Sequence, residues 1–148
     1  MTPQTILVPV DLSSRSMLGL DYAAMLAEAT GASLVLFCNI NLPERAALEP
    51  LALSEHLSVE EAAEAQLRAE GRARGPNIET TVIVGYDDSP AHGILLAAEA
   101  SEADLIVIAS HGRTGMIRWW LGSIAEKVAR TAEIPVVIVP ARTEVIPS

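Results

Sequence analysis

A glycine-punctuated stretch from Ala109 to Ser123 carries the residues best suited to bind a ligand. The β-branched run Leu105–Ile108 precedes this stretch, and a helical pattern follows it from Ile124 to Ala129. The order is therefore strand, loop and helix N-terminus. Glycine lets the backbone approach a ligand closely, and the first turn of a helix offers unpaired N–H groups and positive dipole character. Together these features predict a binding site for phosphate.

Asp11 is a second candidate, because it directly follows Thr5–Val10, an apolar run that predicts a buried strand. In an open doubly wound sheet, ligands bind beyond the carboxyl ends of the strands, where the strand order reverses. If the order is 3-2-1-4-5, Asp11 and the glycine loop face one crevice although they lie far apart in the sequence. Asp11 could instead cap the helix that follows it. Beside the glycine loop, we favour contact with a ligand.

The remaining polar residues do not form a catalytic set. His111 titrates near neutrality, but neither a Gly-x-Ser-x-Gly motif nor a Ser-x-x-Lys motif with partners accompanies it. His56 and His92 lack the spacing of metal ligands. Arg113 either reaches a phosphate or is a solvated loop arginine. We therefore expect a binding protein and not an enzyme, with no metal ion held by protein side chains.

The elements that position these residues alternate between strands and helices. The predicted strands are Thr5–Val10, Ser33–Cys38, Ile78–Val84, Asp104–Ala109 and Pro135–Val139. The predicted helices run from Ser13 or Ser14 to Thr30, from Ser54 to Arg74, from Ser89 to Ser101 and from Gly122 or Ser123 to Ala132. The alternation predicts an α/β fold: an open, doubly wound, Rossmann-like sheet of five parallel strands with helices on both faces. A single domain covers residues 1–148.

Two local predictions accompany this assignment. The apolar residues of the first helix recur at helical spacing and mark its apolar face: Leu18, Tyr22, Met25, Leu26 and Ala29. The segment from Asn39 to Leu53 contains Pro43 and Pro50, and it is predicted to be a long loop.

The composition restricts the partners and the compartment. The net charge of −9 argues against a nucleic-acid backbone, which needs clusters of Lys and Arg, but it does not exclude a small nucleotide. No apolar run is long enough to span a bilayer, and Met1–Gln4 shows no secretory signal. The lone Cys38 excludes an intramolecular disulfide and fits a reducing compartment. We expect a cytoplasmic protein with Cys38 in its core.

The chain resembles the universal stress protein family over nearly its whole length. The resemblance rests on Val8–Asp11 at the first strand, on Gly85 after the third strand and on a pattern of the ATP-binding branch. That pattern is Gly, two residues, Gly, nine residues, then Gly-Ser or Gly-Thr. Here Ala109 stands at the first glycine, Gly112 at the second, and Gly122-Ser123 at the end.

The resemblance implies ATP, AMP or ADP as the ligand, with Mg²⁺ held through phosphate oxygens. Asp11 would meet the adenosine end, Asn39 would contact adenine through its backbone, and Ala109 would lie under the ribose. Backbone N–H groups would bind the phosphates at Gly112, Gly122, Ser123 and Ile124. The complete candidate site is Pro9, Val10, Asp11, Asn39, Ile108, Ala109, His111, Gly112, Arg113, Gly122, Ser123 and Ile124.

The leading function is that of an ATP-binding stress-response or regulatory protein whose conformation or partner binding changes with the nucleotide. The alternative is an interaction module of the same fold that does not bind ATP. The resemblance also implies a homodimer through the apolar strand Pro135–Val139, unless the tail Ala141–Ser148 covers this edge. Five residues form an apolar cluster that either packs on the sheet or forms a partner surface: Met116, Ile117, Trp119, Trp120 and Leu121.

Overall fold

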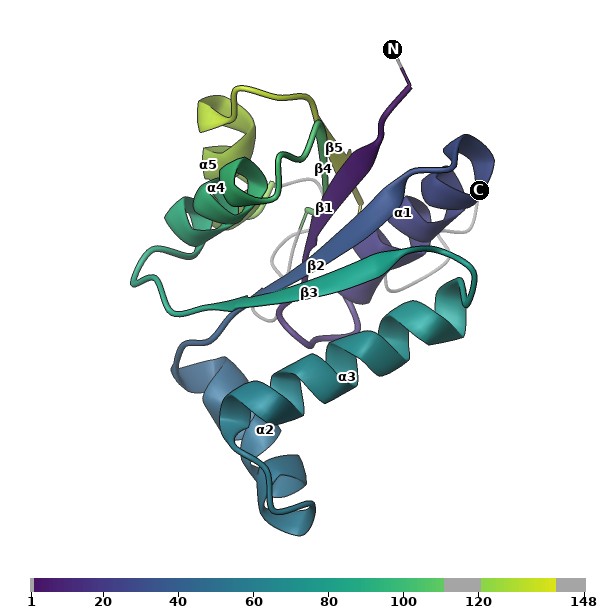
Figure 1. Ribbon diagram of the computed structural model, residues 1–148. Helices are drawn as coiled ribbons and strands as arrows, with labels where there is room; N and C mark the ends of the chain where they lie inside the picture. Colours follow the sequence, from purple (N-terminus) through teal and green to yellow (C-terminus); the bar gives the residue numbers. More distant parts are fainter. Residues whose placement is uncertain (1, 111–120, 141–148) are drawn as a thin grey trace, which may run out of the picture.

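The computed structural model describes residues 2–110 and 121–140. Five parallel strands form one sheet in the order β3-β2-β1-β4-β5 (Figure 1). The strands are β1 (Thr5–Pro9), β2 (Ser33–Asn39), β3 (Thr80–Gly85), β4 (Leu105–Ala109) and β5 (Val136–Val139). The predicted order 3-2-1-4-5 and the Rossmann-like α/β fold are confirmed.

Helices cover both faces of the sheet (Figure 1). The helices α1 (Met17–Thr30) and α3 (Val59–Arg74) pack on one face, and α4 (Pro90–Ala100) and α5 (Ser123–Thr131) pack on the other. Successive strand residues point to opposite faces. Ile6 and Val8 therefore join the core under α1 and α3, whereas Leu7 joins the core under α4 and α5.

The predicted loop from Asn39 to Leu53 is wrong, because α2 (Leu42–Ser54) occupies this segment and packs against α3. Pro43 lies in the first turn, where the missing N–H is not needed. Leu48 and Ala52 are four residues apart, so both reach the core from one side of the helix. Their burial offsets the hydrogen bond that Pro50 removes inside the helix.

The predicted beginnings of two helices are also wrong. The helix α3 begins after Ser58 and not at Ser54, because Ser58 and Glu61 form a capping box. Ser58 Oγ accepts a hydrogen bond from Glu61 N at 3.1 Å, and Glu61 Oε1 accepts one from Ser58 N at 2.9 Å. The N-cap of α1 is Ser16 and not Ser13 or Ser14. Ser13 instead lies in the turn that precedes α1, where its Oγ accepts a hydrogen bond from Ser16 N at 3.2 Å.

The buried side of α1 differs from the predicted apolar face. Leu20 and small residues such as Ala23 and Ala27 pack on the sheet, whereas Tyr22 and Met25 are exposed. Small side chains are needed here because α1 runs very close to β4. A Cβ atom added at Gly19 would lie 3.1 Å from the backbone nitrogen of Ala109. The helix therefore meets the sheet through Leu20 and mostly small residues, and not through Tyr22 and Met25.

The structure also tests the expectations for Cys38 and for membrane-spanning helices. Cys38 is fully buried in the core, as predicted. Among the helices in residues 2–110 and 121–140, none is long and apolar enough to cross a membrane.

Candidate functional site

A pocket of about 280 Å³ opens at the carboxyl ends of β1, β2 and β4, where the strand order reverses. Every predicted site residue that the structure describes lines this pocket: Pro9, Val10, Asp11, Asn39, Ile108, Ala109, Gly122, Ser123 and Ile124. The other predicted site residues, His111, Gly112 and Arg113, lie outside the described residues. Segments distant in sequence therefore converge because β1 is the neighbour of both β2 and β4.

Another part of the pocket lining was not predicted from the sequence: Ser16, Phe37, Asn41, Pro43, Glu44, Pro90, Ile94, Ser110 and Ala125. Three of these residues, Asn41, Pro43 and Glu44, belong to the N-terminus of α2, which was predicted to be a loop. The signal was present, since Asn-x-x-Glu is a capping-box sequence and Glu44, Leu48 and Ala52 recur every four residues.

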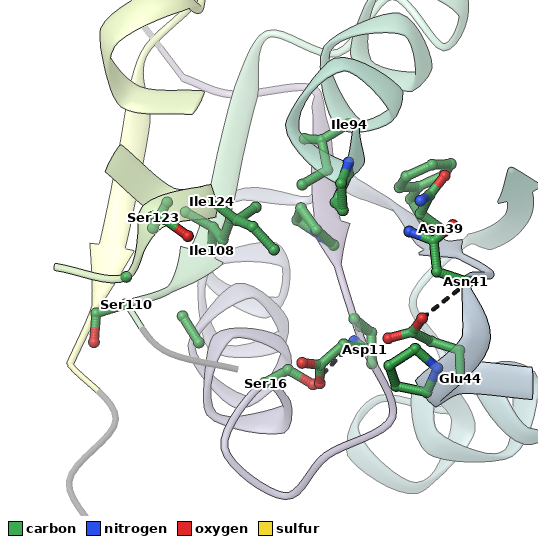
Figure 2. Close-up of a pocket in the computed structure, with 18 residues that line it drawn as sticks. Asp11, Ser16, Asn39, Asn41, Glu44, Ile94, Ile108, Ser110, Ser123 and Ile124 are labelled. Carbon is green, nitrogen blue, oxygen red and sulfur yellow. Dashed lines mark hydrogen bonds between the residues drawn. The ribbon is translucent and has the colours of Figure 1, made fainter. Parts of the chain in front are cut away.

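The turn after β1 holds Asp11 at the floor of the pocket (Figure 2). Asp11 Oδ1 accepts from Ser13 N at 3.0 Å and from Ser13 Oγ at 2.5 Å, and Asp11 N donates to Ser16 Oγ at 3.2 Å. Between them Leu12 has a φ of 69°, a left-handed conformation that is costly for leucine. The interpretation of Asp11 as the helix cap is wrong, because Ser16 is the N-cap and Asp11 orders the turn that precedes it.

The N-terminus of α5 forms the opposite side of the pocket (Figure 2). Gly122 is the N-cap residue of α5, and no side chain caps this helix in the described part of the chain. Gly122 N donates to Ser110 O at 2.8 Å, which holds the helix end beside the end of β4. The first-turn N–H groups of residues 123–125 have no partner within the helix, and the helix dipole places positive charge there. This side of the pocket therefore favours an anion.

The end of β2 is fixed by the side chain of Asn39. Its Nδ2 donates to Asp87 O, and its Oδ1 accepts from Asp87 N, both at 2.9 Å. Gly93 permits this arrangement, since a Cβ atom there would lie 2.9 Å from Asn39 Oδ1. Hydrogen bonds from the backbone N–H of Ser89 and from the side chain of His92 hold the pKa of Asp87 below its ordinary value. The loop after β3 is thereby attached to the pocket wall.

The charges around the pocket are unevenly placed. Asp11 and Glu44 line it, and none of the described lining residues is Lys or Arg. Figure 2 shows both carboxyl groups away from Ser123 and Ile124, which begin α5. A ligand with one anionic end and one end rich in hydrogen-bond donors fits this distribution of charge, with the anionic end at α5.

Metal binding by side chains has no support in the described residues. No group of three or more His, Cys, Asp or Glu side chains in residues 2–110 and 121–140 is arranged to hold a metal ion.

The fold and the pocket define an α/β protein of the doubly wound, Rossmann-like class, with its candidate ligand site where the strand order reverses. The model of the universal stress protein family matches residues 3–140. The chain belongs to the universal stress protein family.

Known relatives agree with this assignment. The universal stress protein MJ0531 of Methanocaldococcus jannaschii is 32% identical over 142 residues, which cover 90% of this chain and 80% of that protein. The structure of the hypothetical protein MJ0577 superposes with a TM-score of 0.76 at 22% identity, covering 97% of this chain and all of that one. A universal stress protein solved in complex with cAMP has a TM-score of 0.67 at 24% identity, covering 96% of this chain and 100% of that chain. These two structures share the fold.

Proposed function

We propose that this protein binds adenine nucleotides, with ATP as the leading candidate, and acts as a stress-response regulator. The observation that carries the proposal is the convergence of four chain segments on one pocket. They are the ends of β1, β2 and β4 and the N-terminus of α5, which no described side chain caps. The cAMP complex of a family member with the same fold supports an adenine nucleotide as the ligand class.

The charge distribution supports one orientation of the nucleotide. The phosphates lie at Gly122 and Ser123, where backbone N–H groups and the helix dipole attract anions. The adenosine lies toward Asp11 and Asn39. Because the amide group of Asn39 already binds Asp87, this residue contacts adenine through its backbone. Ile94 and Ile108 supply apolar surface between these ends.

The rest of the site belongs to the same proposal. His111, Gly112 and Arg113 complete the phosphate end, and Mg²⁺ binds through phosphate oxygens. Ala109 lies under the ribose. Successive residues of a strand point to opposite faces of the sheet, so Ala109 points to the same face as Leu105 and Val107. Both of these residues belong to the core under α1. The methyl group of Ala109 therefore leaves room for the nucleotide.

The protein acts by binding and not by turnover. No described residue of the pocket is placed as a general base with an adjacent nucleophile, and the lining is dominated by apolar side chains and backbone. Binding of the nucleotide changes the conformation of the protein or its binding to a partner, and the protein acts in the cytoplasm. The alternative, an interaction module of the same fold without ATP, predicts a pocket that no nucleotide enters.

Calorimetric titration and thermal unfolding with ATP, AMP and cAMP, each with and without Mg²⁺, test the proposal. At a ligand concentration of about 100 times Kd, binding to the folded state alone adds about 2.7 kcal/mol of stability. The Gly122→Val variant should fold and lose binding. The backbone at Gly122, with φ −62° and ψ 149°, accommodates any residue, whereas the new side chain enters the phosphate end. No heat and no thermal shift at millimolar nucleotide would support the alternative.

The edge strand β5 supports a second proposal, a homodimer through Pro135–Val139. In the described part of the chain β5 pairs only with β4, and its residues Val136–Val139 are all apolar. Such an edge offers unpaired N–H and C=O groups to another strand. Light scattering should give about twice the chain mass of 15.7 kDa. A monomer at micromolar concentration would oppose the dimer without affecting the nucleotide proposal.

A further inference from the structure

Glu44 places a buried carboxylate in the wall of the pocket. The residue is only 9% exposed, although it lies in the first turn of α2 at the protein surface. Its Oε1 accepts from Asn41 N at 3.0 Å, which fixes the orientation of the group. A buried carboxylate is costly unless its oxygens accept hydrogen bonds. The backbone bond to Asn41 satisfies only part of this capacity.

The second oxygen of Glu44 is available to the pocket. Figure 2 shows it turned away from Asn41 and toward the side on which Asp11 lies. Within residues 2–110 and 121–140, the hydrogen bond from Asn41 is the one that this carboxylate receives. A bound molecule with a donor at this point would complete it.

The position of Glu44 indicates which part of a nucleotide it meets. Glu44, Asn39 and Asn41 line the side of the pocket opposite Ser123 and Ile124 (Figure 2). With the phosphates at α5, the base is the part that reaches this side. A carboxylate only accepts hydrogen bonds. Adenine presents a donor, its exocyclic 6-amino group, whereas the 6-oxo purines present an acceptor at the same position.

We propose that Glu44 determines base specificity by accepting a hydrogen bond from the 6-amino group of the purine. This inference depends on the proposed nucleotide site and adds a residue that selects among nucleotides. A 6-oxo purine places an oxygen against the carboxylate oxygen, which leaves both acceptors unpaired away from water. The pocket therefore rejects inosine nucleotides even though their phosphates fit equally well.

The direct test compares ATP with ITP and with purine riboside triphosphate, which lacks the 6-amino group. One charge-assisted hydrogen bond is worth about a 10- to 100-fold change in affinity. The wild-type protein should bind ATP more tightly than either analogue by that factor. Equal affinities for all three nucleotides would overturn the role of Glu44 while leaving the nucleotide site intact. No binding of any of them would instead defeat the proposed function.

The Glu44→Gln variant separates specificity from a structural role. Asn41 N still needs an acceptor, so the new amide turns its oxygen to Asn41 and its NH₂ group to the pocket. Affinity for ATP should fall about 10-fold or more while affinity for ITP rises. A helix-capping role alone would lower both affinities together. The Glu49→Gln variant, at an exposed position of the same helix, is the control and should change neither.

A ribose contact is the remaining competitor for this carboxylate. Sugar hydroxyl groups are also donors, and 2′-deoxy-ATP and 3′-deoxy-ATP each lack one of them. One pair of results would show that Glu44 binds the sugar and that the proposal is wrong. The wild type would bind either deoxy analogue about 10-fold or more weakly than ATP, whereas Glu44→Gln would not. In addition, the wild type would bind purine riboside triphosphate as tightly as ATP.

Discussion

Replacing Gly122 by Asp should strengthen the fold and weaken nucleotide binding by more than tenfold. Gly122 is the N-cap residue of α5, and its φ of −62° and ψ of 149° suit any L-residue. Asp is a preferred N-cap residue, and its carboxylate complements the positive end of the helix dipole. The same carboxylate then occupies the space in which a phosphate would bind.

The two effects can be estimated separately. The better cap, the dipole and the smaller entropy of the unfolded chain together give about 1 kcal/mol of added stability. For 148 residues this corresponds to a rise in Tm of about 3 °C. A carboxylate about 4 Å from a phosphate oxygen repels it by about 4 kcal/mol at an effective dielectric constant of about 20. Half of this repulsion, about 2 kcal/mol, already weakens binding about 25-fold.

Thermal unfolding without ligand and calorimetric titration with ATP measure the two effects on one sample. The Gly122→Asn variant is the matched control, because its side chain has nearly the same shape and also caps helices, but it carries no charge. Its Tm should rise while its affinity falls less than that of the Asp variant. If the Asp variant binds ATP as tightly as the wild type, the phosphate end has been misplaced. If Asp and Asn weaken binding equally, the electrostatic argument fails.

Three further predictions concern the stability of the fold. Glu102 has a φ of 55°, so Glu102→Gly should relieve a left-handed conformation and raise the stability in urea by about 0.5–1 kcal/mol; a loss would contradict the assigned strain. The pKa of Asp87 lies below the ordinary value of an aspartate. Its ionised form therefore stabilises the fold above that ordinary pKa, and this contribution disappears as the pH falls through the lowered pKa. The wild type should therefore exceed Asp87→Asn in urea midpoint at pH 6, and the difference should shrink at pH 3. Gly19→Ala should lose about 1 kcal/mol, because crowding against the Ala109 backbone outweighs the gain in helix propensity, and nucleotide affinity should fall with it.

The parallel sheet and much of the lining of the candidate pocket were predictable from patterns in the sequence, whereas the order 3-2-1-4-5 was assumed, because periodicity alone does not reveal it. Apolar β-branched runs separated by helical periods indicate parallel strands, and parallel strands bring Asp11 and Ala109 to one edge. The role of α2 was not predictable in this way. Pro43 and Pro50 indicate a loop locally, whereas the spacing of Asn41 and Glu44 indicates a helix start, and the burial of Leu48 in the assembled core decides for the helix. Tertiary packing overrode local propensity there, and Glu44 was missed with it.

The buried side of α1 shows the same limit from the opposite direction. Tyr22 and Met25 are large and apolar, so their spacing indicated a core-facing side, yet both are exposed. What decides the orientation is the close approach of Gly19 to the end of β4, and a distance between two backbones is not visible in a pattern of side-chain types.

Because β1 lies at the centre of the sheet, its pairing with β2 and β4 also determines when the pocket can form during folding. Of the strands of this sheet, β1 is synthesised first. It pairs on one side with β2, a near neighbour in the sequence, and on the other with β4, which is made much later. Asp104 joins these distant parts, because its carboxylate accepts from Gln4 N and Thr5 N at 3.0–3.1 Å. Docking of β4 closes a long loop and is a slow kind of folding event. The candidate pocket, whose lining includes residues of β4 and α5, is consequently complete only after β4 has docked.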